Sequence, residues 1–142
     1  MGNRERWKRM PELPPDIERS IDRLHPLFEE RNVLLAYLFG SLSRDEDRAP
    51  QDLDLAILRR DDAVYRLRAE IADRVGSQRL DLVDLATASP VLRFEIVRTG
   101  RLVYEADSLV TERFELETIR LYRDTAHLRR SQLKHLSEKL TG

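Results

Sequence analysis

The 142-residue sequence contains no cysteine. This absence excludes disulfide bonds, thiolate zinc sites and cysteine nucleophiles. No stretch approaches the roughly 18 apolar residues of a membrane-spanning helix. The charged N-terminus also lacks the apolar core of a secretory signal. Together these absences favour a cytoplasmic protein that does not enter the membrane.

A strong net charge is also missing, because 25 basic and 26 acidic residues leave a formal net charge of −1. We therefore expect no direct binding to nucleic acid, since the chain has no overall attraction to phosphate backbones. The length and a hydrophobic fraction of 41% fit one globular domain with its own core. Bases outnumber acids in residues 120–139, which suggests that the C-terminal segment faces a partner.

One motif stands out: a Gly40-Ser41 pair, ten further residues, and then Asp52 and Asp54 on either side of Leu53. We interpret the two aspartates as part of a β-strand, in which alternate side chains point the same way. Two carboxylates on one face repel each other unless a cation lies between them. Hard oxygen ligands of this kind suit Mg²⁺. The motif therefore predicts a magnesium site.

The residues before this pair form a turn that could hold phosphate. Gly40 lets the backbone come close to a ligand, and Ser41 offers a hydroxyl and a backbone N–H near an expected helix start. We interpret the pair as the binding site for a triphosphate that also contacts the metal. The alternatives are a plain strand-to-helix turn and two solvated strand carboxylates, although aspartate is depleted in strands.

The pattern Gly40-Ser41-x10-Asp52-x-Asp54 resembles the signature of polymerase-beta-type nucleotidyltransferases, and the short chain is most similar to their minimal, MNT-type branch. Residues 79–85 resemble the strand that provides the third carboxylate of this family. Residues 90–105 resemble the helix and strand that usually follow it. The resemblance implies an α/β (α+β) nucleotidyltransferase fold, with a mixed, mainly antiparallel sheet flanked by helices.

The resemblance also assigns roles to individual residues. Asp81 is the expected third carboxylate, and Asp84, which points to the opposite strand face, is interpreted as a turn or capping residue. Two Mg²⁺ ions would be held by Asp52, Asp54 and Asp81, and Gly40 and Ser41 would bind the β- and γ-phosphates of ATP. The implied reaction is attack of a hydroxyl on the α-phosphate with release of pyrophosphate.

Hydrophobic periodicity predicts alternating helices and strands, beginning and ending with a helix. We expect a single domain with a core over about 15–107 and a C-terminal helix over about 108–140. The expected helices of the core are 16–31, 41–47, 63–75 and 90–99, and the expected strands are 33–39, 53–58, 80–85 and 102–104.

The resemblance implies a partner protein as well. MNT-type proteins are commonly paired with HEPN ribonuclease toxins and act as their antitoxins, which implies transfer of AMP from ATP to a tyrosine of the toxin. Two alternatives stay open at this point. The chain could neutralise its partner by stoichiometric binding, or it could be a small-molecule nucleotidyltransferase that modifies an aminoglycoside-like compound.

Overall fold

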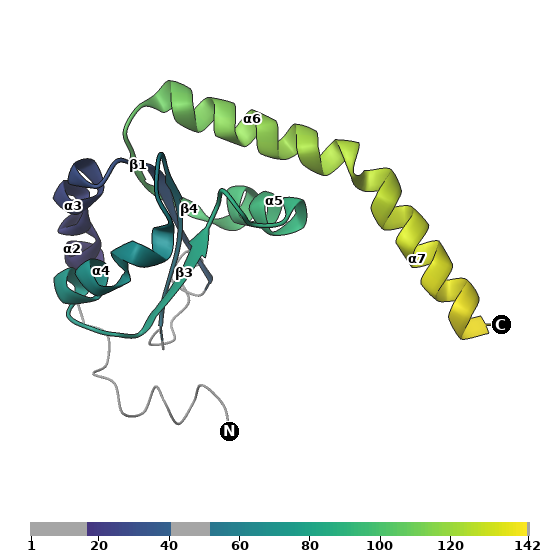
Figure 1. Ribbon diagram of the computed structural model, residues 1–142, viewed down its shortest axis with the longest axis horizontal. Coiled ribbons are helices and arrows are strands. Elements are labelled where there is room, and N and C mark those ends of the chain that lie inside the picture. Colours follow the sequence, from purple (N-terminus) through teal and green to yellow (C-terminus); the bar gives the residue numbers. More distant parts are fainter. Residues whose placement is uncertain (1–16, 41–51, 142) are drawn as a thin grey trace.

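A computed structural model of the chain describes residues 17–40 and 52–141, and at its centre lies a four-stranded sheet (Figure 1). The strand order is β3-β2-β1-β4. The strands are β1 (Val33–Phe39), β2 (Leu53–Arg59), β3 (Leu80–Asp84) and β4 (Arg101–Glu105). Strand β1 pairs antiparallel with both β2 and β4, whereas β2 and β3 are parallel. The expected mixed, mainly antiparallel sheet is therefore confirmed.

One face of the sheet is covered by the helices of the N-terminal half (Figure 1). These helices are α2 (Ile17–Asp22), α3 (Leu24–Glu30), the 3-10 helix η2 (Val64–Leu67) and α4 (Arg68–Val75). Alternate residues of β2, namely Leu53, Leu55 and Ile57, are buried against them. This is the face that strand alternation predicts for the apolar residues between and after the two aspartates.

The other face is covered by α5 (Pro90–Thr99) and α6 (Ser108–Asp124). Its smaller core includes Tyr37 of β1, Ala56 of β2 and Ile96 of α5. Helix α5 begins and ends as predicted, because the Ser89 hydroxyl accepts a hydrogen bond from the Leu92 backbone N–H at 3.2 Å and Gly100 follows the last helical residue.

The first predicted helix is divided into α2 and α3 around Arg23. Pro26 explains the division, because its ring has no N–H to donate and would collide with the Asp22 carbonyl in a continuous helix. The segment predicted as helix over 63–75 begins as η2 and continues as α4. The helix expected over 41–47 lies outside the described residues.

The C-terminal segment is helical as predicted, but it bends between α6 and α7 (Ala126–Thr141) (Figure 1). The bend follows from Thr125, whose hydroxyl donates to the Leu121 carbonyl at 2.8 Å. Arg129 fixes it by donating to the Tyr122 carbonyl at 2.9 Å and to the Thr125 hydroxyl at 2.8 Å. Across the described residues, none of the helices combines the length and the apolar character needed to cross a membrane.

Candidate functional site

Three carboxylates meet at one end of the sheet, on the face that α5 and α6 cover. Asp52 directly precedes β2, Asp54 lies within β2 and Asp81 lies within β3. Asp54 and Asp81 are direct neighbours in the parallel pairing of these strands. Each aspartate offers one oxygen, and these oxygens lie within 4.8 Å of one another. The structure thus brings together the three acidic residues that sequence reasoning selected.

The three carboxylates differ in burial, and this affects their chemistry. Asp52 and Asp54 are half-buried, whereas Asp81 is exposed. The pKa of Asp54 is raised to about 7, first by burial and then by the negative charges of Asp52 and Asp81 and a hydrogen bond with Asp52. A divalent cation among the carboxylates would offset the repulsion between them and favour the ionised form of Asp54. The donor set therefore fits Mg²⁺.

Gly40 directly follows β1 and lies beside Asp54, since Phe39 pairs with Asp54 across the two strands. The backbone of Gly40 has a φ of +75°, in the left-handed region that glycine adopts without strain. A Cβ atom at this position would collide with Oδ2 of Asp54. Glycine is therefore required here both for its backbone conformation and for the space that the Asp54 carboxylate occupies. Ser41 lies outside the described residues, so its assignment to phosphate stays a prediction.

Asp84 has the structural role that we expected. Its Oδ1 atom accepts a hydrogen bond from the Ala86 backbone N–H at 2.9 Å, in the turn that follows β3. The two aspartates of β3 thus have different surroundings, because only Asp81 joins the carboxylate cluster. Asp84 therefore provides a natural control for experiments on Asp81.

Sequence reasoning missed a polar contact that holds α6 against the same face of the sheet. The Tyr37 hydroxyl donates to a carboxylate oxygen of Glu115 at 2.5 Å. Burial and the neighbouring carboxylate raise the pKa of Tyr37, so the phenol stays protonated. The signal was a tyrosine within the apolar run of β1, because a buried hydroxyl usually finds a partner.

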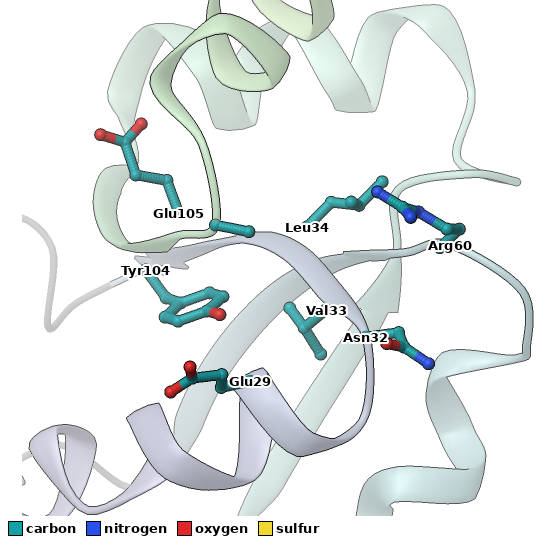
Figure 2. Close-up of a pocket in the computed structure, with 8 residues that line it drawn as sticks. Glu29, Asn32, Val33, Leu34, Arg60, Tyr104 and Glu105 are labelled. Atoms are coloured by element: carbon teal, nitrogen blue, oxygen red, sulfur yellow. The ribbon is translucent and has the colours of Figure 1, made fainter.

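A pocket of about 420 Å³ lies elsewhere in the molecule, where β1 begins and β4 ends (Figure 2). Glu29, Arg60, Tyr104 and Glu105 are among the residues that line it. The carboxylate cluster lies at the other end of β1, where Phe39 pairs with Asp54. None of Gly40, Asp52, Asp54 and Asp81 lines this pocket, so it is separate from the candidate site.

Comparisons with known proteins agree with this geometry. The family model of the polymerase beta nucleotidyltransferases matches residues 22–109. A relative from Shewanella oneidensis, the protein adenylyltransferase MntA, is 35% identical over an alignment of 91 residues, and the match covers 62% of this chain. The match spans 65% of that relative, slightly less than two thirds of its length.

Solved structures show the same fold. A toxin–antitoxin structure with AMP-PNP superimposes with a TM-score of 0.67 at 27% identity, covering 82% of this chain and 98% of that chain. A complex of a tri-AMPylated Shewanella oneidensis HEPN toxin with its MNT antitoxin gives a TM-score of 0.66 at 26% identity, covering 84% of this chain and 98% of that chain. On the family match and the shared fold, the chain belongs to the polymerase beta nucleotidyltransferase family.

Proposed function

We propose that this chain is an antitoxin that transfers AMP from ATP to a tyrosine of a partner HEPN ribonuclease toxin and thereby neutralises it. The observation that carries the proposal is the cluster of Asp52, Asp54 and Asp81 beside Gly40 in a chain of this family. The relatives support a HEPN toxin as the partner that receives AMP, because one is named a protein adenylyltransferase and another is bound to a tri-AMPylated HEPN toxin.

Asp52, Asp54 and Asp81 would hold two Mg²⁺ ions in this proposal. When bound, Mg²⁺ supplies positive charge that stabilises the attacking and leaving oxygens of the transfer. Gly40 lets the backbone approach the β- and γ-phosphates closely, because it carries no side chain and has a positive φ. Ser41 would complete the contact with its hydroxyl and its backbone N–H.

The transfer exchanges one bond for another at the α-phosphorus of ATP. The acceptor hydroxyl oxygen forms a bond to this phosphorus, and the bond from the phosphorus to the oxygen that bridges the β-phosphate breaks. Pyrophosphate leaves with the bonding electron pair, and the hydroxyl proton passes to the Asp81 carboxylate. Asp81 suits this task because it is the exposed member of the cluster, where an acceptor on another protein can reach it.

The test uses the chain purified together with a candidate HEPN partner protein. We expect the intact mass of the HEPN protein to increase by one or more AMP groups, only when ATP and Mg²⁺ are present. Peptide mapping should place AMP on a tyrosine. Asp52→Ala/Asp54→Ala should abolish the mass increase, whereas Asp84→Asn should retain it because Asp84 lies outside the cluster.

The two other functions give different results in the same experiment. If Asp52→Ala/Asp54→Ala still neutralised the toxin fully at equimolar amounts, neutralisation by stoichiometric binding would replace catalysis as the function. If the HEPN protein kept its mass while a free aminoglycoside gained AMP, the small-molecule reaction would be the correct one.

A further inference from the structure

The core-facing side of α6 continues as an apolar row on α7 that no described residue covers. On α6, Thr111, Phe114 and Thr118 recur every three or four residues and are buried against the core. The row ends at Tyr122, whose ring stacks on Phe94 of α5 with centroids 3.9 Å apart. Up to this point the sheet and α5 cover the inner side of the C-terminal helices.

Beyond the bend the same side of the chain is exposed. Arg129 turns back toward α6, with its guanidinium carbon 3.8 Å from the centre of the Tyr122 ring. Leu133, Leu136 and Leu140 follow Arg129 at intervals of four, three and four residues, so they lie on one side of α7. We call these three leucines the α7 row. They are 66%, 55% and 87% exposed, and α7 contains no buried residue among those described.

The position of α7 explains the exposure. Figure 1 shows that α7 extends past the sheet and past α5, so its inner side has no described element of the chain beneath it. The bend is also fixed by three contacts of Arg129, one to a carbonyl, one to a hydroxyl and one to an aromatic ring. An apolar row that is held in a defined direction away from its own core is suited to contact with another molecule.

The charged residues beside the α7 row indicate which kind of molecule covers it. At about 100° per residue, Arg130 and Lys139 lie roughly 90° to either side of the centre of the α7 row, and Glu138, the one acidic residue of α7, lies nearly opposite. Both margins of the row are therefore basic. A second copy would bring basic margins against basic margins, which is unfavourable. A groove with acidic margins would instead complement both the leucines and the charges.

We propose that the α7 row docks into an apolar groove between helices of the partner toxin, and that carboxylates along this groove pair with Arg130 and Lys139. The proposal takes the partner from the proposed function and adds the surface that holds it. Docking is independent of the chemistry, because α7 contributes no residue to the carboxylate cluster. The exposed Asp81 can then receive a tyrosine from a protein that α7 has already bound.

The experiment measures, by calorimetry, the affinity of the purified chain for the HEPN partner protein used in the test of the proposed function. We expect Leu133→Ala/Leu136→Ala to weaken binding by about tenfold or more, because two leucine side chains would no longer be buried. The matched control is Ser131→Ala/His135→Ala, on the other side of the same helix, which should leave the affinity unchanged. Arg130→Gln/Lys139→Gln should weaken binding and make it much less sensitive to salt, because the two positive charges that pair with the carboxylates are lost.

Three results would overturn the proposal. One is that the unmodified chain forms no complex with the HEPN protein, and another is that the Leu133→Ala/Leu136→Ala variant binds it with the same affinity as the unmodified chain. The third result is a loss of affinity in the control variant as large as that in the leucine variant. A dimer of the chain alone that dissociates in the leucine variant would show that a second copy covers the row. Sedimentation with phosphatidylserine vesicles that depends on the same leucines would show that a membrane surface covers it.

The outcome is separable from that of the proposed function. If the complex depends on the α7 row but the HEPN protein gains no AMP, docking stands and the proposed transfer is wrong. If AMP is transferred while the leucine variant binds normally, the transfer stands and docking through α7 is wrong. The thermal unfolding of each variant should match that of the unmodified chain, since all the substituted residues are on α7 and none is buried.

Discussion

The carboxylate of Asp54 lies so close to Gly40 that it occupies the position which the Cβ atom of any other residue at position 40 would need. The absence of a side chain at residue 40 therefore leaves room for one of the three clustered carboxylates. The two halves of the motif are separated by ten residues in the sequence. They meet at this point of the fold, where Gly40 lies beside Asp54.

Gly40→Ala should reduce the affinity for Mg²⁺, because the new methyl group displaces the Asp54 carboxylate. The positive φ adds a stability loss of about 1–2 kcal/mol. Gly76→Ala is a matched control, since Gly76 has a φ of +82° but no atom within 4 Å of the added Cβ. We expect both variants to unfold at lower denaturant concentration and only Gly40→Ala to lose Mg²⁺ affinity in a calorimetric titration. Equal Mg²⁺ affinities in the two variants would contradict this explanation.

The stability of the metal-free protein should fall as the pH rises from about 4 to about 7. The pKa of Asp54 is raised from 3.8 to about 7 in the folded state, so over this range the folded state holds a proton that the unfolded state has released. Denaturant unfolding with EDTA at several pH values measures this trend. Asp54→Asn should remove most of the slope, and saturating Mg²⁺ should remove it from the unmodified protein. An unchanged slope in Asp54→Asn would assign the trend to other groups.

Mg²⁺ should raise the melting temperature of the protein, because a ligand that binds only the folded state stabilises it. Asp81→Asn should lose most of this increase, since it removes one of the three clustered carboxylates. Asp84→Asn is the control on the same strand and should keep the increase, although it loses the turn hydrogen bond to Ala86. Thermal melts with and without Mg²⁺ distinguish the two variants. A normal Mg²⁺ response in Asp81→Asn would remove Asp81 from the site.

Tyr37→Phe should destabilise the protein by about 1–3 kcal/mol, because the half-buried Glu115 carboxylate would lose the phenol that donates to it. Tyr65→Phe removes the hydroxyl of a side chain that is 70% exposed and should change stability by less than about 0.5 kcal/mol. Urea unfolding of both variants provides the comparison. Equal stability of the two variants would show that the contact between β1 and α6 contributes little.

Local pattern was sufficient to predict the strands and the faces of the sheet. The run from Val33 to Phe39 coincides with β1, and the alternation after Asp52 gives the correct burial of Leu53 and Leu55. The meeting of Asp81 with the other two aspartates rested on the family resemblance, because no local rule gives the parallel register of β2 and β3.

Other features depend on contacts between distant residues and could not be predicted. The collision of a Gly40 side chain with Asp54 requires the register of β1 on β2, and the bond from Tyr37 to Glu115 joins residues 78 positions apart. The bend at Thr125 interrupts a helical pattern that has no proline or glycine to mark it. The bend is caused by the Thr125 hydroxyl, which donates to the Leu121 carbonyl, and by Arg129 of the next turn, which donates to the Thr125 hydroxyl.

No residue of α7 is buried, so this helix contributes little to the core that holds the sheet and the carboxylate cluster together. Substitutions at the exposed residues of α7 other than Arg129 leave the interior and the carboxylate cluster unaltered, so the proposed docking surface can change separately. If α7 docks the partner as proposed, exchanging residues 126–141 between related proteins should change which partner the chain binds.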